Sequence, residues 1–206
     1  EVTVLEPAPA FPDACFVEDC ALLTERGAVL TRPGAEARRG EVALIEPELA
    51  DRFEQLAFVE APGTLDAGDV LQVDDHFYVG LSARTDRAGA EQLLAILEGF
   101  GYGGELVPMR EMLHLKTGVN ALADGRLLVT GEFVQAPAFA GFERIVVSAQ
   151  EAYAANSLWI NESVIVPAGF PRTLEQLRTL DYDVREVDVS EFRKMDGGLS
   201  CLSLRY

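Results

Sequence analysis

The chain has 206 residues, of which 49% are hydrophobic and 25% are charged, a composition typical of a globular protein long enough to bury its own core. Asp and Glu number 34 against 17 Lys and Arg, which gives a formal charge of −17 at pH 7. This charge argues against nucleic acid and anionic membrane surfaces as partners, and it suits a cationic ligand.

The sequence lacks the usual signals of membrane insertion and secretion. No apolar run approaches the roughly 18 residues of a membrane span, and no basic segment with an apolar run opens the chain. Three cysteines are too few, and odd in number, for a disulfide framework, so we expect a reducing compartment, the cytoplasm. Because the chain opens on Glu1 rather than Met, we expect that N-terminal residues are missing.

The first part of the chain holds two units of one pattern, in which two strands form a hairpin and a helix follows. Apolar residues at helical spacing, from Ala90 to Leu97, support the second helix, and Gly101 follows it. The elements that we predict here are strands 15–24 and 28–31 and a helix from about 35, then strands 69–73 and 76–81 and a helix over 86–100.

The pattern recurs twice more. Asp124-Gly125 between apolar runs is a strong hairpin signal, whereas Pro137 and Gly141 interrupt the helix expected after it. The predicted elements are strands 118–122, 126–130 and 144–147, strands 157–160 and 163–166, a helix over 171–180, a strand over 184–187 and a lone final strand, 201–205. Such repetition indicates a radial α/β arrangement within a single domain, residues 1–206.

Acidic residues crowd two short stretches of the chain. Asp13, Glu18 and Asp19 lie in the first stretch, and Asp66 and Asp69 lie in the second. On a strand, Glu18 and Asp19 would point to opposite faces, and a buried carboxylate needs a cation or several donors. On these residues alone, solvated acids in loops and at strand ends are the alternative.

The histidines and cysteines are few. His114 lies among apolar residues, which taken alone favours a buried core residue. His76 follows a hairpin turn, which favours an exposed turn residue. Cys201 follows a Gly-Gly turn that can expose its sulfur to backbone amides, although a small buried hydrophobe is the alternative. Cys15 and Cys20 are predicted to be core residues. Two distant histidines without a Cys-x-x-Cys pair predict no metal site.

Several arginines lie near the predicted helix starts. A guanidinium fork binds carboxylates in bidentate fashion, so any of them could hold an α-carboxylate, the alternative being a solvated surface charge. These arginines are Arg32, Arg38, Arg39, Arg84 and Arg172. The glycine-rich signatures of nucleotide binding and the G-x-S-x-G signature of serine hydrolases are absent.

Eight segments, in order and at compatible spacings, resemble the dimethylarginine dimethylaminohydrolase family. They are residues 11–19, 32–40, 65–69, 80–85, 113–117, 153–156, 190–194 and 196–201. The family belongs to the guanidino-group-modifying (amidinotransferase) superfamily, so the resemblance implies a five-bladed α/β propeller, or pentein, of repeated ββαβ units. Family members begin with a strand, a covering loop and a helix that are absent here, so the first unit is expected to be incomplete at its N-terminus.

The resemblance also implies a role for each matching residue. Cys201 matches the nucleophile, His114 matches the acid/base, and Asp66 matches the carboxylate that orients the histidine or binds the guanidinium group. Glu18 and Asp19 match acids that bind the guanidinium group, and three further residues match those that hold the amino-acid end of the substrate. The substrate-binding residues implied in this way are Asp13, Glu18, Asp19, Arg38, Arg84 and Ser200.

The implied activity is that of a dimethylargininase. Cys201 would attack the guanidinium carbon of asymmetric dimethylarginine or monomethylarginine, giving citrulline and dimethylamine or methylamine through a covalent S-alkylthiouronium, without cofactor or metal. The alternatives are an arginine deiminase, which releases ammonia, a non-catalytic protein that binds cationic amino acids, and a purely structural propeller. The expected partner is a small-molecule substrate, and whether the chain forms a homodimer stays open.

Overall fold

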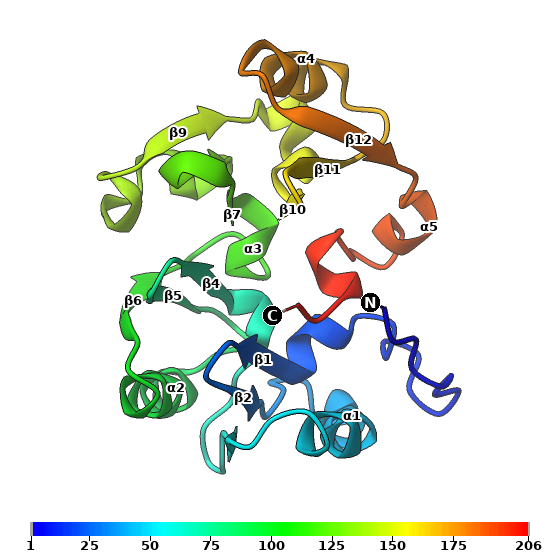
Figure 1. The fold of residues 1–206 in the computed structure, drawn as a ribbon, viewed down its shortest axis with the longest axis vertical. Helices are drawn as coiled ribbons and strands as arrows, with labels where there is room; N and C mark the ends of the chain where they lie inside the picture. Colours follow the sequence, from blue (N-terminus) through cyan, green and yellow to red (C-terminus); the bar gives the residue numbers. More distant parts are fainter. Residues whose placement is uncertain (1, 206) are drawn as a thin grey trace.

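The computed structural model describes residues 2–205, and its sheets repeat around a central axis (Figure 1). Each sheet has three strands: an antiparallel hairpin, and a third strand that pairs in parallel with the second strand of that hairpin. The predicted α/β class and its repeated ββαβ units are confirmed. Residues 2–205 form four such sheets, the number expected of a five-bladed propeller with one incomplete unit.

The sheets follow one another along the chain. The first is β1 (Ala21–Thr24), β2 (Gly27–Leu30) and β3 (Leu56–Phe58), and the second is β4 (Val70–Val73), β5 (His76–Leu81) and β6 (Gly103–Pro108). The third is β7 (Val119–Ala121), β8 (Arg126–Val129) and β9 (Glu143–Val146), and the fourth is β10 (Leu158–Ile160), β11 (Ser163–Pro167) and β12 (Asp183–Val187). The first strand of each sheet lies toward the centre of the molecule (Figure 1).

Helices cross from the second strand to the third strand on the outside of the molecule (Figure 1). They are α1 (Val42–Ala50) in the first unit, α2 (Arg87–Gly99) in the second and α4 (Pro171–Thr179) in the fourth. In α2, the Asp86 side chain caps the N-terminus by accepting the Gly89 N–H at 2.7 Å, and Leu93 and Leu97 are completely buried against the sheet. The α2 prediction is therefore confirmed.

The third unit replaces its crossing helix with two short 3₁₀ helices, η5 (Gly131–Gln135) and η6 (Pro137–Phe139). Pro137 stands at the first position of η6, where it lacks the amide hydrogen that a continuing helix would need. Phe133 and Phe139 from these turns are buried in the core of this unit. This agrees with the interruption predicted from Pro137 and Gly141.

One helical turn precedes the first strand of each sheet. These turns are η1 (Val17–Cys20), η3 (Ala67–Asp69), α3 (Leu115–Gly118) and η7 (Ala149–Ala155), and a similar turn, η8 (Ser200–Leu202), lies near the end of the chain. Because the first strands surround the central axis, these turns bring distant parts of the sequence together. The remaining short helices are η2 (Glu36–Glu41), η4 (Ala123–Gly125) and α5 (Ser190–Arg193).

Three local predictions were wrong. The strand predicted over 15–24 is limited to Ala21–Thr24, because residues 17–20 form η1 instead. Residues 201–205 are not a strand: Cys201 lies in η8, and within the described chain no neighbouring strand pairs with the residues after it. Cys15 is exposed, although Cys20 is buried as predicted.

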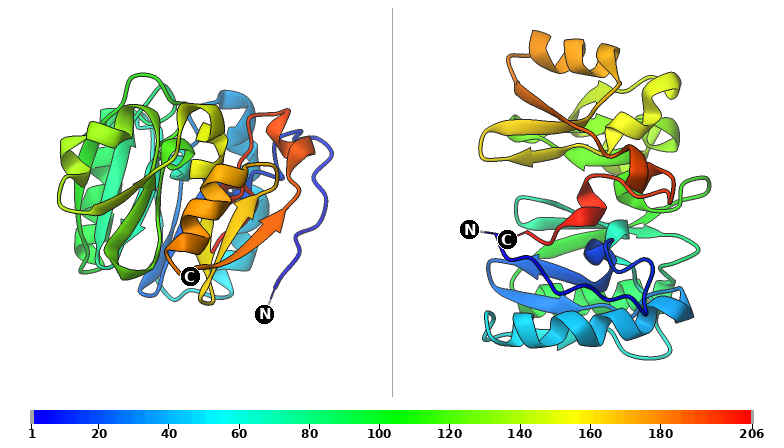
Figure 2. Two further views of the ribbon diagram at one scale, coloured as in Figure 1. Left: turned by 90° about the horizontal axis from the view of Figure 1, so that it is seen from above. Right: turned by 90° about the vertical axis from the view of Figure 1, so that its right-hand side faces the viewer.

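The side views in Figure 2 show that the first and last described segments emerge on the same side of the molecule. All three cysteines, Cys15, Cys20 and Cys201, are free. Among the described residues, no helix combines the length and the hydropathy that crossing a membrane would require.

Candidate active site

A cavity of about 30 Å³ lies where the helical turns of different units meet. Its lining includes Glu18 of the first unit, His114 and Lys116 of the third, Asn156 of the fourth, and Ser200 and Cys201 of η8. The fold therefore brings the predicted nucleophile, the predicted acid/base and one predicted guanidinium-binding acid around one space, although up to 183 positions separate them in the sequence.

Glu18 is a buried carboxylate with two strong partners. Its Oε1 lies 2.7 Å from the Lys116 ammonium nitrogen, and its Oε2 accepts a hydrogen bond from the Ser200 hydroxyl at 2.7 Å. Only 3% of Glu18 is exposed, so these donors offset the large cost of burying its charge. Because η1 is helical rather than extended, Glu18 and Asp19 are both buried on the inner side, and the prediction that they would point to opposite faces of a strand was wrong.

Asp19 contacts three elements beside the cavity. Its Oδ1 accepts the Gly68 N–H at 3.1 Å and lies 3.9 Å from the His114 Nε2, and its Oδ2 accepts a hydrogen bond from Arg38. Burial raises the pKa of Asp19, as does the charge of Asp66, while His114 and Arg38 oppose that rise. A Cβ on Gly68 would lie 2.7 Å from Asp19 and 2.9 Å from His114, so only glycine allows this close approach.

His114 and Asp66 form a hydrogen-bonded pair, with 3.0 Å between Nε2 and Oδ2. The other oxygen of Asp66 accepts the Gly34 N–H at 2.9 Å, which fixes the carboxylate. Burial alone would lower the pKa of His114, but the hydrogen bond to Asp66 and the charges of Asp19 and Asp69 outweigh it and raise this pKa to about 9. His114 is therefore an imidazolium at neutral pH and can donate a proton.

Asp69 holds the backbone of the turn that directly follows His114. One oxygen of its buried carboxylate accepts the Leu115 N–H at 2.9 Å, at the start of α3, and the other accepts the Ser82 hydroxyl at 2.6 Å. Burial raises the pKa of Asp69. The carboxylate therefore fixes the turn that carries His114, and it does not line the cavity.

Cys201 is half-buried at the cavity wall. Its sulfur accepts the Gly198 N–H at 3.4 Å. Burial, together with the charges of Glu18 and Asp19, raises the pKa of the thiol to about 12, while the Gly198 N–H and Lys116 oppose that rise. The thiol is therefore protonated at neutral pH until something adds positive charge beside it.

Arg38, which the family resemblance assigns to the amino-acid end of a substrate, is engaged by several groups of the protein itself. Its guanidinium group is buried and donates to Asp19, to both oxygens of Glu41 and to the carbonyls of Phe16 and Asp13. These contacts use its donors inside the protein, and Arg38 is not among the residues that line the cavity. The structure thus favours a role in holding Asp19 over direct contact with the amino-acid end of a substrate.

Arg84 and Asp13 are different. Both are half-buried, and within residues 2–205 no hydrogen bond or ion pair engages the guanidinium of Arg84 or the carboxylate of Asp13. The Arg84 backbone packs against Gly34, whose N–H binds Asp66, so Arg84 is near this carboxylate although it does not line the cavity itself. Both residues are available to bind a charged group.

Among residues 2–205, one group of side chains is close enough to hold a metal ion. The candidate ligand atoms of Asp19, Asp66 and His114 lie within 4.8 Å of one another. However, Gly68 and Arg38 occupy the oxygens of Asp19, and Gly34 and His114 occupy those of Asp66. The donor set fits a hydrogen-bonded charge network better than a metal centre, and a metal-free reaction stays the prediction.

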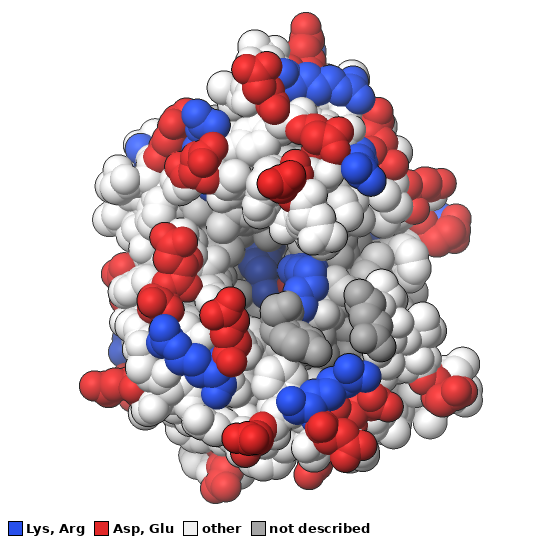
Figure 3. Space-filling view, viewed as in Figure 1, with Lys and Arg blue, Asp and Glu red and all other residues white. Residues whose placement is uncertain are grey.

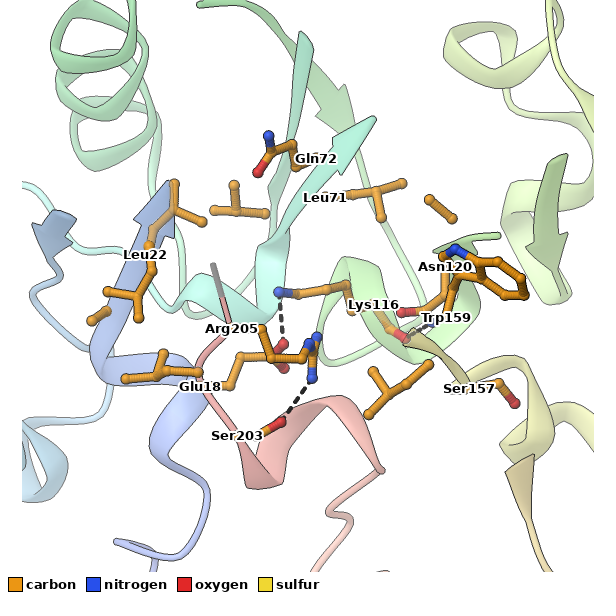
Figure 4. Close-up of a pocket in the computed structure, with 16 residues that line it drawn as sticks. Glu18, Leu22, Leu71, Gln72, Lys116, Asn120, Ser157, Trp159, Ser203 and Arg205 are labelled. Carbon is orange, nitrogen blue, oxygen red and sulfur yellow. Dashed lines mark hydrogen bonds and ion pairs between the residues drawn. The ribbon is translucent and has the colours of Figure 1, made fainter. Parts of the chain in front are cut away.

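A second, larger cavity of about 210 Å³ opens along the central axis. Figure 3 shows the hollow at the centre of this face, with Lys and Arg side chains inside it. Its lining residues include Leu71, Trp159, Lys116 and Arg205. Figure 4 shows the Glu18–Lys116 ion pair among the residues that line this cavity. Glu18 and Lys116 line both cavities, so this pair lies between them.

Several residues that line the cavity had been given no role from the sequence, among them Lys116 and Asn156. Lys116 and Asn156 both lie in segments that resemble the family, residues 113–117 and 153–156, and both line the cavity. The sequence signal was therefore present, but a lysine or an asparagine in such a segment says nothing by itself about which distant side chain it meets. His76, by contrast, is at the start of β5, half-buried, 3.6 Å from Glu105 and outside the site.

Residues 2–145 match the family model described as arginine deiminase. Because this match covers more than half of the chain, the chain belongs to that family. The whole chain is also 52% identical to the N(G),N(G)-dimethylarginine dimethylaminohydrolase of Pseudomonas aeruginosa, over 82% of that protein. Within the family, the chain groups with the dimethylarginine dimethylaminohydrolases, and the resemblance drawn from the eight segments is confirmed.

Solved structures agree with this assignment. A mutant of the Pseudomonas aeruginosa enzyme complexed with citrulline matches 97% of this chain and 79% of its own, with a TM-score of 0.96 and 51% identity. A dimethylarginine dimethylaminohydrolase variant in an adduct with S-methyl-L-thiocitrulline matches the whole chain and 82% of its own, with a TM-score of 0.98 and 51% identity.

Proposed function

We propose that this chain hydrolyses N-methylated arginines, releasing citrulline and methylamine or dimethylamine. The observation that carries the proposal is the single cavity where a free cysteine, a protonated histidine and the buried carboxylate of Glu18 meet. A substrate cation is the natural complement of this set, since Glu18, Asp19 and Asp66 place three acids around the site.

Binding begins with the charge of the guanidinium group. Its planar N–H groups match carboxylates on either side, so Glu18 and Asp19 hold the cation flat and in register with the sulfur of Cys201. Arg84 binds the α-carboxylate and Asp13 the α-ammonium group of the substrate, because each offers an unengaged charge of the required sign. Arg38 acts one step away by holding Asp19.

The substrate also activates the nucleophile. Burial and the nearby acids hold the pKa of Cys201 at about 12, and a cation placed beside the sulfur lowers it by favouring the thiolate. The thiol proton passes to solvent, and the thiolate then attacks the guanidinium carbon and forms the C–S bond. The free enzyme thus keeps its sulfur protonated and unreactive, and the thiolate forms where the substrate is.

His114 supplies the proton that the leaving group needs. With a pKa of about 9, the imidazolium gives its proton to the departing amine nitrogen as the C–N bond breaks, leaving an S-alkylthiouronium on Cys201. The neutral imidazole then takes a proton from water, whose oxygen attacks the same carbon. The C–S bond breaks, citrulline leaves and Cys201 is restored. Asp66 orients the ring in both steps.

The relatives support the same substrate class. The Pseudomonas aeruginosa enzyme carries the name of this activity and has been crystallised with citrulline, the product expected here. No cofactor enters the scheme, and a methylated arginine is its small-molecule partner. A single domain over residues 1–206, a cytoplasmic location and the formation of a homodimer stay predictions.

Citrulline release from asymmetric dimethylarginine, monomethylarginine and arginine tests the proposal directly. Methylated substrates should turn over with stoichiometric release of the methylamine, and Cys201→Ser should abolish turnover while it retains binding. Arginine turned over in preference, with release of ammonia, would instead support the second candidate, an arginine deiminase, which the description of the matching family favours. Binding of either substrate without any turnover by the intact wild-type chain would favour the non-catalytic alternative.

A further inference from the structure

Asn156 lies between the helical turn and the first strand of the fourth unit, in the region of the repeat from which the site residues of the other units also come. Glu18 lies within the turn before β1, and Asp66 and His114 immediately precede the turns before β4 and β7. Asn156 directly follows η7, two residues before β10, and its side chain lines the same cavity. Asn156 therefore shares a cavity with the site residues, although no role has yet been given to it.

The side-chain amide of Asn156 binds the residue next to the nucleophile at two points. Its Oδ1 accepts the Ser200 N–H at 2.8 Å, and its Nδ2 donates to the Ser200 hydroxyl at 3.1 Å. The Nδ2 also donates to the Lys116 carbonyl at 3.1 Å. Ser200 is completely buried and Asn156 is 5% exposed, so water does not replace these bonds.

These contacts fix the direction of the Ser200 hydroxyl proton. A hydroxyl has one hydrogen to donate, and because its oxygen accepts from Asn156, that hydrogen is free to point at Glu18 Oε2, 2.7 Å away. Asn156 therefore connects the turn of the nucleophile to the carboxylate that receives the guanidinium group. Chains of hydrogen bonds of this kind strengthen one another in a buried site.

The loop before the nucleophile is held at its other end by the same helical turn. The Tyr153 hydroxyl donates to the Gly197 carbonyl at 2.6 Å. Tyr153 and Asn156 therefore bind this loop at two points, residues 197 and 200. A Cβ on Gly198 would lie 2.5 Å from Asn156 Cγ, which shows how closely the loop is pressed against the amide. Between these two hydrogen-bonded points, the Gly198 N–H donates to the sulfur of Cys201.

We infer that Asn156 is a positioning residue for Cys201. By holding Ser200 through two hydrogen bonds, Asn156 fixes the position and orientation of the neighbouring sulfur relative to the guanidinium carbon. The inference rests on the proposed function. Attack needs the reacting atoms within about 3–3.5 Å of each other and aligned, and a displacement of about 1 Å can cost 100-fold in rate. Asn156 acts through Ser200 and the loop, without touching the reacting atoms.

The structure offers a closely matched control. Asn120 is also 5% exposed, and its Nδ2 donates to the same Lys116 carbonyl, at 2.7 Å, and to the Ala155 carbonyl at 2.8 Å. Within residues 2–205 it makes no hydrogen bond to the loop over 197–201. Asn120→Ala therefore reports the cost of losing a buried amide without loss of the hydrogen bonds to Ser200.

The experiment compares Asn156→Ala, Asn156→Asp and Asn120→Ala with the wild type, by steady-state citrulline release and by the rate at which iodoacetamide alkylates Cys201. Asn156→Ala should lower kcat by about 10- to 100-fold with a much smaller change in KM. Iodoacetamide should alkylate Cys201 of this variant several-fold faster, because the sulfur is no longer held in place. Asn156→Asp keeps an acceptor for the Ser200 N–H, so its alkylation rate should return toward the wild-type rate. Asn120→Ala should lower the melting temperature but keep both kcat and the alkylation rate.

Equal losses of kcat in Asn156→Ala and Asn120→Ala, or an unchanged alkylation rate in folded Asn156→Ala, would overturn the inference. If the wild type itself releases no citrulline, the proposed function fails, and the alkylation rates alone still decide whether Asn156 positions the sulfur. If Asn156→Ala does not fold, the kcat of Asn156→Asp decides, because loss of the bond to the Ser200 hydroxyl should still lower kcat, and a wild-type kcat would overturn the inference.

Discussion

Glu18 and Lys116 form a buried ion pair, with 2.7 Å between Oε1 and Nζ, and both residues line the candidate active-site cavity as well as the cavity on the central axis, in which Figure 4 shows the pair. The side chains are only 4% and 12% exposed. Lys116 therefore offsets the buried negative charge of Glu18, the carboxylate that we propose binds the substrate cation.

Replacing Lys116 tests this balance. Lys116→Met leaves Glu18 with the Ser200 hydroxyl as its main donor, and removing one partner of a buried pair typically costs about 3–5 kcal/mol. Urea unfolding of the variant should show a loss of this order, and asymmetric dimethylarginine, added in the Cys201→Ser background, should raise its melting temperature more than it raises that of Cys201→Ser alone. Arg87→Met, which removes an exposed ion pair with Glu91, is the control and should change the unfolding midpoint little. Similar small effects in both variants would contradict a buried, balancing role.

The raised pKa of His114 predicts a distinct titration. The chain has two histidines, so proton NMR of the imidazole Cε1–H resonances should resolve His114, with His76→Gln assigning the other signal. His114 should titrate at about 9, and Asp66→Asn should lower this value, because burial then outweighs the remaining charges. A His114 pKa near 6.5 in the wild type would show that the Asp66 bond does not hold the proton.

The same shift links stability to pH. The folded-state pKa of His114 is raised above its unfolded value of 6.5, so its contribution is fully present below pH 6.5 and is lost as pH rises through 9. Relative to His114→Gln, the wild type should lose about 3 kcal/mol of unfolding free energy across this window, at 1.36 kcal/mol for each pKa unit. Parallel pH profiles for the two proteins would contradict this.

The thiol of Cys201 should ionise only when a cation is bound. Thiolate absorbance at 240 nm, taken as the difference between wild type and Cys201→Ser, should rise with an apparent pKa well above the ordinary value for a thiol in the free protein. The guanidinium ion should shift this titration to lower pH, whereas urea, which is neutral and of similar shape, should leave it unchanged. A thiolate already formed at neutral pH without ligand would contradict activation by the substrate.

Arg84 and Arg38 should separate substrate binding from structure. Arg84→Gln removes a charge-assisted bond to the α-carboxylate, worth about 1.5–3 kcal/mol, so KM should rise roughly 10- to 100-fold with little change in kcat. A substrate analogue without the α-carboxylate should have the same KM in both proteins, which serves as the internal control.

Arg38→Gln should behave differently. It breaks buried pairs with Asp19 and Glu41, so we expect a loss of about 3–5 kcal/mol in unfolding free energy. Turnover should fall because Asp19 is no longer held, and the analogue without an α-carboxylate should be affected as strongly as the full substrate. A rise in KM confined to the full substrate would restore Arg38 to the role that the family resemblance implied.

The repeat could be predicted from the sequence because hairpins and helices are encoded locally. The Asp124-Gly125 turn and the helical spacing within α2 are examples, and both strands and helices appear where these patterns place them. The strand predicted through Glu18 was wrong because a short apolar run with two acids does not distinguish a strand from a helical turn. What decides is the burial of both acids against partners elsewhere in the chain.

The candidate site was predicted in part. Cys201, His114, Asp66, Glu18, Asp19 and Ser200 are brought together by the fold. The partners of these residues could not be predicted in the same way. Glu18 and Ser200 are 182 positions apart, and the engagement of Arg38 with Glu41 depends on a 3₁₀ turn that no motif announces. Contacts between units follow from how the sheets pack around the central axis, which no local pattern encodes.

The reacting residues lie in turns at one end of the first strands, and the hairpin turns lie at the other end. The four-residue strand β1 separates the turn with Glu18 from the hairpin turn at Glu25-Arg26 by about 13 Å, at about 3.3 Å for each residue. The turns at Asp124-Gly125 and Asn161-Glu162 are placed in the same way. A fluorophore or a peptide tag attached at such a loop would report on the protein while leaving its chemistry untouched.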